Sequence, residues 1–417
     1  MSRLKGFPGL IIKPEWVEKV TTGPYDAYTP EQRQVITSEN PFSFLNVTRS
    51  FEDLPTEKQN DIEGLLNDCK EAMDHLYETN VYQTFDEPSL FIYRIDIPHN
   101  GKTHSQTGIV GLVPVEDTGS LRILKHEEVR PERSDLMSRH LVTVEASSSP
   151  ISLTCKNDEQ LNKAINNCTS NDPVLITEDS EMKQTIWRVV GETARELSEL
   201  VNNKTLYITD GHHRMAAAEE ALKKSKNHNK ALESTLAVLF PDDEMLVLPF
   251  HRRVGDIENR SSQELLKSIN SVCEIEKSED FSPKQDGEVA LYIDGQNYQM
   301  LLPKSNGNNL VDQLDVARLQ EHILSPIFGV VNPGTHKLID YVPGPLGVDV
   351  VKERCDKDSW VGFIMHPLNI KNLMDVAEAG ELMPPKSSYL MPKPRSGVFV
   401  RDLNRDCLLY TSPSPRD

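Results

Sequence analysis

Residues 210–214 read Asp-Gly-His-His-Arg, and side chains of these types suit the binding of an anion. Imidazole and guanidinium groups donate hydrogen bonds to phosphate or carboxylate oxygens, and arginine can donate two in parallel. Residues 206–208 are apolar and residues 216–222 are strong helix formers, so the pattern predicts a strand, a turn and a helix. The amide groups and the dipole at the start of such a helix favour negative charge. The sequence therefore predicts that Gly211, His212, His213 and Arg214 form a turn that binds phosphate or carboxylate.

The details of this turn leave other interpretations open. Asp210 is placed to cap the helix, because its carboxylate can accept from amide groups of the first turn. Gly211 permits a sharp turn or the close approach of a ligand. A capped helix whose histidines and arginine face solvent would show the same pattern. A single metal ion fits less well, because adjacent side chains on a helix point roughly 100° apart.

Other residues suited to chemistry lie outside this turn. His126 and Glu127 stand together on a predicted loop, where such a pair suits acid–base or metal chemistry, although an exposed polar loop has the same composition. His251 and Arg252 end a predicted strand, where they either line a cleft or face solvent at a sheet edge. Lys386 lies in a proline-rich loop that either presents it to an anion or acts as a structural clamp.

Composition and charge narrow the class of protein. The chain has 417 residues, of which 37% are hydrophobic and 26% charged, as in a folded soluble protein. Its net charge of -19 disfavours non-specific binding to nucleic acid or to an anionic membrane. No apolar run approaches the roughly 20 residues that span a bilayer, and residues 1–8 do not predict a signal peptide. The six scattered cysteines form no CxxC pair, so we expect a reducing, cytoplasmic compartment. From the net charge and the lack of a long apolar run we expect no nucleic-acid or membrane partner.

Periodicity predicts an α+β protein of two domains. Apolar segments on both sides of Asn100-Gly101 predict a hairpin, and strands are predicted at 186–190 and 236–240. These segments are expected to build one mixed sheet that borders the ligand-binding cleft. From about residue 256 the pattern changes, with a second hairpin at 288–302. We therefore divide the chain into a core of residues 1–255, a C-terminal α+β lobe of residues 256–403, and a tail of residues 404–417. The tail resembles translated sequencing-adaptor sequence and is expected to be disordered.

Several separated motifs resemble the domain-of-unknown-function 1015 family. They are the Pro-Tyr-Asp turn at 24–26, Asp-Gly-His-His-Arg at 210–214, Leu-Pro-Phe-His-Arg at 248–252 and the proline-rich segment 383–397. Gly23 stands where the family usually has another proline, and Lys125 stands where a proline usually precedes the His-Glu pair. The resemblance extends to about Leu403. The family is related to ParB/sulfiredoxin-like proteins and to free-serine kinases.

The resemblance implies a fold, a reaction and roles for residues. The implied fold is α+β, with a mixed sheet in a ParB/sulfiredoxin-like nucleotide-binding core and a second α+β lobe. The implied reaction is the nucleotide-dependent phosphorylation of the hydroxyl of free L-serine or a similar hydroxy amino acid, with ATP or ADP and Mg²⁺. The candidate catalytic carboxylates are Asp26, Glu127 and Asp210. The candidate substrate-binding residues are His126, His251, Arg252 and Lys386.

Two other functions agree with the same residues. One is a ParB-like module that binds a nucleotide without transferring a phosphoryl group. The other is a metal-dependent hydrolase that uses His126, His212 and His213. The sequence contains no Walker A loop and no protein-kinase signature set, so those two routes to phosphoryl transfer are excluded.

Overall fold

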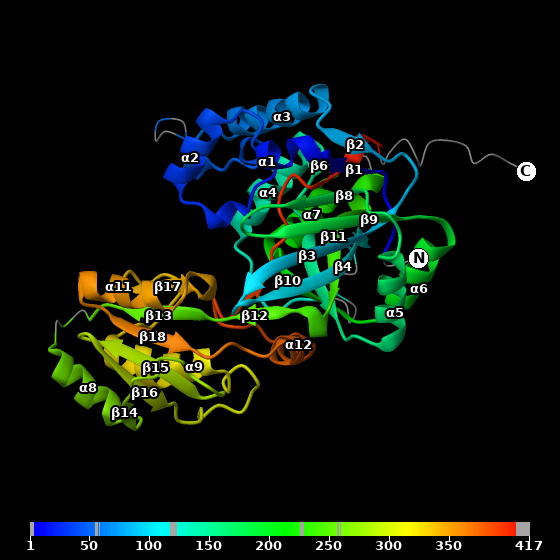
Figure 1. Cartoon of the computed structure of the whole chain (residues 1–417). Coiled ribbons are helices and arrows are strands. Elements are labelled where there is room, and N and C mark those ends of the chain that lie inside the picture. Colours follow the sequence, from blue (N-terminus) through cyan, green and yellow to red (C-terminus); the bar gives the residue numbers. More distant parts are fainter. Residues whose placement is uncertain are drawn as a thin grey trace, which may run out of the picture. The chain divides into compact units, whose positions relative to one another are not determined.

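Figure 1 shows the computed structural model of the chain, which describes residues 4–54, 57, 59–116, 123–225, 229–256, 258 and 260–405. The chain divides into two compact units. Unit 1 comprises residues 1–125, 129–245 and 392–417, and unit 2 comprises residues 126–128 and 246–391. Among the helices of the described ranges, none is long and apolar enough to cross a membrane.

Unit 1 combines strands and helices that alternate irregularly along the chain. Its described strands are β1 (Gly9–Ile12), β2 (Tyr82–Thr84), β3 (Leu90–His99), β4 (Lys102–Pro114), β5 (Ile123–Leu124), β6 (Ala146–Ser147), β7 (Ile151–Cys155), β8 (Leu175–Glu178), β9 (Lys183–Val189), β10 (Leu206–Asp210), β11 (Ser234–Pro241) and β20 (Phe399–Asp402). Its described helices are α1 (Val17–Val20), α2 (Pro30–Glu39), α3 (Ile62–Glu78), α4 (Pro131–Val144), α5 (Glu159–Cys168), α6 (Gly191–Asn202) and α7 (His212–Lys224).

The larger sheet of unit 1 has eight strands within the described residues, in the order β5-β10-β7-β11-β4-β3-β9-β8. β10 runs parallel to β5, and β11 runs parallel to β7, whereas the remaining pairs are antiparallel. The β3–β4 hairpin turns at Asn100 and Gly101, which both have positive φ as an Asn-Gly turn requires. The predicted α+β class, the hairpin and the mixed sheet are confirmed.

A smaller sheet in the described part of unit 1 has the order β2-β1-β20-β6. It pairs the last strand, β20, with the first strand, β1, in antiparallel register. β20 is therefore fixed beside β1, and the segment just before β20 belongs to unit 1.

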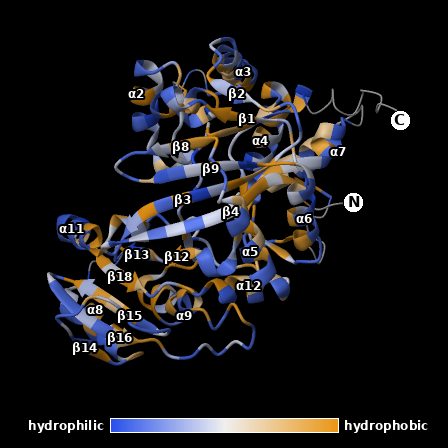
Figure 2. Cartoon of the chain, turned by 45° about the vertical axis from the view of Figure 1, so that its right-hand side comes forward, coloured by the Kyte–Doolittle hydropathy of each residue, from blue (hydrophilic) through white to orange (hydrophobic). Residues whose placement is uncertain are grey.

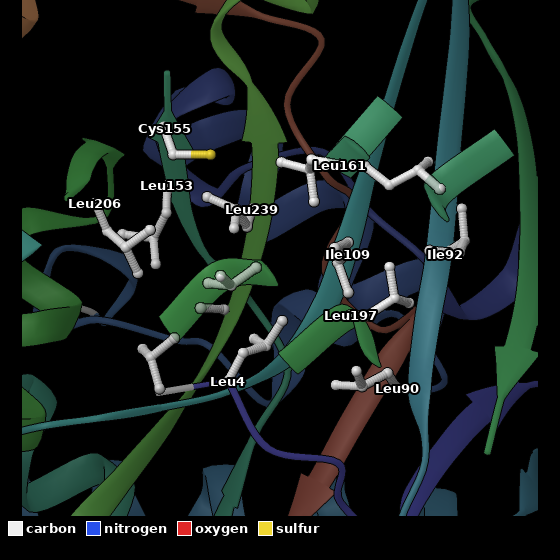
Figure 3. Close-up of a cluster of buried hydrophobic side chains, with 14 of the residues drawn as sticks. Leu4, Leu90, Ile92, Ile109, Leu153, Cys155, Leu161, Leu197, Leu206 and Leu239 are labelled. Carbon is white, nitrogen blue, oxygen red and sulfur yellow. The ribbon is translucent and has the colours of Figure 1, made fainter. Parts of the chain in front are cut away.

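A hydrophobic core of unit 1 lies between the large sheet and helices α5 and α6 (Figure 3). Strand residues such as Leu90, Ile109 and Leu239 pack there against Leu161 of α5 and Leu197 of α6. Full burial of a leucine contributes about 1.5–3 kcal/mol relative to exposure. This core holds β10 and β7 in register, and these two strands lead into the candidate site.

Unit 2 contains an antiparallel sheet of six strands in its described residues, in the order β14-β16-β15-β18-β13-β17. Its described strands are β12 (Leu246–Leu248), β13 (Phe250–Val254), β14 (Ile275–Lys277), β15 (Glu288–Ile293), β16 (Gln296–Leu301), β17 (Ile339–Pro343), β18 (Val361–Met365) and β19 (Tyr389–Met391). Its described helices are α8 (Ser262–Asn270), α9 (Asp315–Leu319), α10 (Ser325–Phe328), α11 (Val348–Asp358) and α12 (Ile370–Glu378). Figure 2 shows that the solvent-facing side of α11 is largely hydrophilic, while Val351 and Cys355 on the same helix are buried.

The observed division differs from the predicted boundary after residue 255. Strand β13 belongs to unit 2, because it pairs with β17 and β18 rather than with the large sheet. Residues 392–405 belong to unit 1, because β20 pairs with β1 and β6. Of the predicted disordered tail 404–417, residues 406–417 lie outside the described residues, whereas 404 and 405 continue a helical turn after β20.

Candidate functional site

The turn at residues 210–214 joins a buried strand to a helix, as predicted. β10 ends at Asp210, and α7 begins at His212. Gly211 occupies the N-cap position with φ 97° and ψ 27°, a left-handed conformation that glycine adopts without steric cost. The prediction that Asp210 caps the helix is wrong, because Asp210 still belongs to the strand and its carboxylate is bound elsewhere. A glycine cap has no side-chain oxygen to cover the first turn of α7.

The Asp210 carboxylate holds two cations, Arg214 and Lys393. Arg214, one turn along α7, donates from Nη2 to Oδ2 of Asp210. Lys393 Nζ donates to Oδ1 of the same carboxylate at 2.9 Å. Arg214 Nη1 also donates to the carbonyl oxygen of Pro150 at 2.8 Å, which fixes the plane of the guanidinium. We call Asp210, Arg214 and Lys393 the Asp210 cluster; its formal charge is +1.

The environment of Asp210 keeps it ionised. Burial raises the pKa of this carboxyl, but Lys393 and Arg214, together with His212, outweigh that effect and bring the pKa to about 2. A general base works best when its pKa lies near the operating pH. Asp210 is therefore better suited to orient two cations than to take up a proton. The side chains of Asp210, Arg214 and Lys393 are 32%, 25% and 18% exposed, so a ligand in solution can reach them.

Lys393 is the residue of this cluster that was not among the site residues predicted from the sequence. Its segment is fixed in unit 1 by the Gly397 N–H, which donates to Ser148 Oγ at 2.7 Å. Thr22 and Ser396 exchange two backbone hydrogen bonds of 3.1 and 2.9 Å. The one local signal was the Pro-Lys-Pro run at 392–394, because flanking prolines limit the paths that a lysine backbone can take.

The two histidines of the motif have different surroundings. His212 is buried, and it contributes to the low pKa of Asp210. His213 Nε2 accepts a hydrogen bond of 3.0 Å from the backbone N–H of Arg130, the residue that precedes α4. This bond ties α7 to the start of α4 and occupies one of the two ring nitrogens of His213. We infer that His213 positions α7 more than it contacts a ligand.

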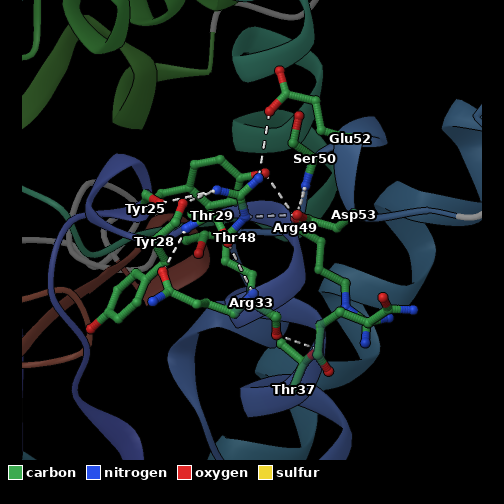
Figure 4. Close-up of polar contacts among 12 residues, drawn as sticks. Tyr25, Tyr28, Thr29, Arg33, Thr37, Thr48, Arg49, Ser50, Glu52 and Asp53 are labelled. Carbon is green, nitrogen blue, oxygen red and sulfur yellow. Dashed lines mark hydrogen bonds and ion pairs between the residues drawn. The ribbon is translucent and has the colours of Figure 1, made fainter. Parts of the chain in front are cut away.

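Asp26 lies in a short 3₁₀ helix, Tyr25–Ala27, and its side chain is outside the described residues. The backbone of this turn is held by Arg33 (Figure 4). Arg33 Nη1 donates to the carbonyl oxygens of Tyr28 at 2.6 Å and of Tyr25 at 3.4 Å, and its guanidinium lies 3.8 Å from the centre of the Tyr25 ring. Asp53 accepts from both Arg33 Nε and the Tyr25 hydroxyl, at 2.7 and 2.8 Å. The turn that carries Asp26 is therefore rigidly built.

The remaining predicted residues belong to unit 2. Glu127 is exposed, and His126 is buried with its carbonyl accepting from the Met383 N–H at 2.8 Å. Arg252 and Lys386 are brought together, because Arg252 Nη2 donates to the Lys386 carbonyl oxygen at 3.1 Å.

His251 of unit 2 is buried and uncharged near neutral pH. Burial, followed by the charge of Arg252, lowers the pKa of His251 to about 4. Its Nδ1 lies 3.3 Å from the Met365 backbone nitrogen and accepts from that N–H. The predicted alternative of solvated basic residues at a sheet edge is wrong for His251 and Arg252, since both side chains are buried.

Comparisons with known proteins agree with the sequence motifs. A family model described as a protein of unknown function (DUF1015) matches residues 4–317. A search of curated proteins finds no match. Three similar solved structures are a free serine kinase in complex with AMP, a mutant of a free serine kinase in complex with ADP, and a conserved hypothetical protein from Pyrococcus furiosus.

The likeness to these structures is low. The first is 14% identical with a TM-score of 0.34, and the second is 13% identical with a TM-score of 0.35; each alignment covers 71% of this chain and 93% of the other. The Pyrococcus furiosus protein is 14% identical with a TM-score of 0.34, over 71% of this chain and 97% of its own.

Proposed function

The chain belongs to the DUF1015 family, and from that premise we propose that it is a nucleotide-dependent phosphotransferase. The proposed acceptor is the hydroxyl of free L-serine or a similar hydroxy amino acid. The choice of acceptor follows the resemblance of the family motifs to free-serine kinases. The choice of reaction class is supported by the geometry of the site.

The observation that carries the proposal is the convergence of two cations at the start of α7. Arg214 and Lys393 both bind Asp210, and Gly211 leaves the first helical turn without a capping side chain. Phosphoryl transfer depends mainly on positioning and on neutralising charge on the phosphate oxygens. A helix N-terminus flanked by arginine and lysine supplies both.

The residues take distinct roles in the proposed reaction. Arg214 and Lys393 bind phosphate oxygens, while Asp210 keeps both cations oriented. The phosphorus–oxygen bond to the nucleotide breaks as a new bond forms to the acceptor hydroxyl oxygen, and a carboxylate takes the hydroxyl proton. Because the pKa of Asp210 is about 2, Asp210 does not suit the role of this base.

The donor set of the Asp210 cluster fits phosphate better than a metal ion. Nucleotide phosphates match the two cations and the helix start. Each oxygen of Asp210 already accepts from a cation, so this carboxylate does not fit as a Mg²⁺ ligand. Mg²⁺ stays an expectation from the resemblance, and when bound it would neutralise phosphate charge.

The test is a direct assay of product. The full chain is incubated with Mg²⁺, either ATP or ADP, and a panel of hydroxy amino acids, and phosphorus NMR identifies any phosphorylated amino acid. We expect O-phosphoserine from the wild type and a loss of roughly 100-fold or more in kcat/KM for Arg214→Gln. Arg195→Gln is the control, because Arg195 is an exposed arginine on α6 of the same unit.

Each outcome of the assay decides between functions. Nucleotide binding without a phosphorylated product would replace the proposal by the non-transferring module. Hydrolysis that needs a transition metal and no acceptor would favour the hydrolase. Equal loss of activity in Arg195→Gln and Arg214→Gln would show that the effect does not arise at the Asp210 cluster.

A further inference from the structure

Arg252 of unit 2 is a buried cation without an acidic partner among the described residues. Its side chain is 3% exposed. Nη1 donates to the Phe250 carbonyl oxygen at 2.6 Å, Nη2 donates to the Lys386 carbonyl oxygen at 3.1 Å, and the guanidinium lies 5.4 Å from the centre of the Tyr341 ring. A guanidinium has five N–H donors, so these two bonds leave three for another acceptor.

The next residue on β13, Arg253, is a buried arginine that does have acidic partners. Arg253 is also buried, and it binds Asp340 Oδ2 at 3.0 Å and Asp358 Oδ2 at 2.9 Å. Burial lowers the pKa of Arg253, but its hydrogen bonds to the two aspartates outweigh burial and raise it. Burial lowers the pKa of Arg252 to about 10, and there only the Tyr341 ring opposes it. Arg252 therefore remains charged near neutral pH, and its buried charge is offset by two carbonyl oxygens and an aromatic ring but by no carboxylate among the described residues.

The surroundings of Arg252 are shaped on one side by the loop that carries Lys386. The backbone of Lys386 has φ 58°, a left-handed conformation that a residue with a side chain rarely adopts. This conformation directs its carbonyl oxygen onto Arg252, while its Nζ lies 5.0 Å from the centre of the Phe250 ring. Ser387 stabilises the loop by donating from its hydroxyl to the Pro384 carbonyl oxygen at 2.6 Å.

We propose that Arg252, assisted by Lys386, binds the carboxylate group of a small organic ligand within unit 2. The buried guanidinium supplies the charge and the paired N–H donors. The aromatic rings of Phe250 and Tyr341 supply an apolar border. The proposal explains why a charge is kept at a position where the protein supplies no counter-ion.

A carboxylate fits this site better than a phosphate. The planar guanidinium matches the two oxygens of a carboxylate in a bidentate pair. Arg252 supplies one buried positive charge, which matches the single negative charge of a carboxylate, whereas Lys386 is exposed and its charge is weakened by solvent. The adjacent His251 is uncharged near neutral pH, because burial lowers its pKa to about 4, so it adds no second buried cation.

The inference does not depend on phosphotransfer, and its test contains no nucleotide. The full chain is titrated with acetate, L-serine or inorganic phosphate at neutral pH, and binding is followed by ligand-observed NMR. We expect both carboxylates to bind to the wild type in a saturable manner. Arg252→Gln should weaken binding about tenfold or more, and Lys386→Gln roughly threefold.

Arg354→Gln is the matched control, because Arg354 is a half-exposed arginine of unit 2 and its substitution removes the same charge. It should bind both carboxylates as the wild type does. The proposal is overturned if neither carboxylate binds, or if Arg252→Gln binds them as tightly as the wild type. Binding of phosphate alone, lost in Arg252→Gln, would overturn the choice of carboxylate. If Arg252→Gln does not fold, Lys386→Gln is compared with Arg354→Gln. Weaker carboxylate binding in Lys386→Gln alone supports the proposal, and equal binding in the two variants overturns it.

Discussion

The Asp210 cluster of unit 1 and Arg252 of unit 2 both present positive charge to an anion, but their cations are held by different groups. In the first, one carboxylate holds Arg214 and Lys393, so two cations are already oriented before a ligand arrives. In the second, a single guanidinium is oriented by the carbonyl oxygens of Phe250 and Lys386 and has no carboxylate of its own among the described residues. Preorganised cations lower the cost of stabilising a transferring group. A cation without its own anion gains most from a ligand that supplies one.

The largest expected effect comes from removing one cation of the Asp210 cluster. Lys393→Met lowers the formal charge of the cluster from +1 to zero, while Arg214 still compensates Asp210. We expect kcat/KM for phosphotransfer to fall by roughly 100- to 1000-fold, as for the loss of one donor to a developing anion. The measurement is steady-state phosphorylation of the acceptor found in the panel assay.

Arg395→Met is the matched control for this substitution. Arg395 lies two residues along the same segment, but it binds Asp179 at 2.5 Å and Glu181 at 3.1 Å. Its loss should change kcat/KM by less than about threefold, because Arg395 pairs with the partly exposed Asp179 and the exposed Glu181 and not with Asp210. If Arg395→Met is as inactive as Lys393→Met, the segment as a whole matters and the lysine charge does not.

The two neighbouring arginines of β13 should differ in stability. Arg253→Gln leaves Asp340 and Asp358 without their common partner, and we expect a loss of roughly 1–3 kcal/mol in the free energy of unfolding. This range is reduced because the two aspartates are 35% and 36% exposed. Arg252→Gln removes a buried charge without stranding an acid, so it should cost less. Urea unfolding of both variants measures the difference, and a larger loss for Arg252→Gln would assign that residue a structural role.

These contrasts also show how far the sequence alone can lead. The order of residue types around 210–214 predicted the strand, the turn and the helix, because each element has a local pattern. No local pattern indicated that Lys393 binds Asp210, since 183 residues separate them and long-range bonds of the segment before β20 hold Lys393 in unit 1. The cap was assigned to Asp210 on propensity, but two cations bind that carboxylate and glycine takes the cap position. Long-range pairing and competition between partners cannot be read from spacing.

A smaller effect is expected from a substitution at Gly211, where an added Cβ would contact the Arg214 side chain. In Gly211→Ala, the new Cβ would lie 2.9 Å from Arg214 Nε, and the backbone has φ 97°. Gly191→Ala is the control, because Gly191 also has positive φ, at 64°, but nothing lies within 4 Å of a Cβ there. Each alanine should cost roughly 1 kcal/mol in unfolding free energy through backbone strain. Gly211→Ala alone should also reduce phosphotransfer, and equal activity in the two variants would separate Arg214 from the reaction.

The smallest expected effect is a pH dependence that the Asp210 cluster should show and Arg252 should not. The pKa of Asp210 in the folded chain, about 2, lies below that of an unfolded aspartate, so its ionised form stabilises the fold above the unfolded value. This contribution is lost as pH falls through about 2. Asp210→Asn should therefore lower Tm by about 1–3 °C near neutral pH, and the difference from wild type should vanish in strong acid. Arg252→Gln should show no such change in the acid range, because no described carboxylate binds Arg252. A constant difference between wild type and Asp210→Asn down to the lowest accessible pH would mean that the carboxylate contributes through packing rather than through its charge.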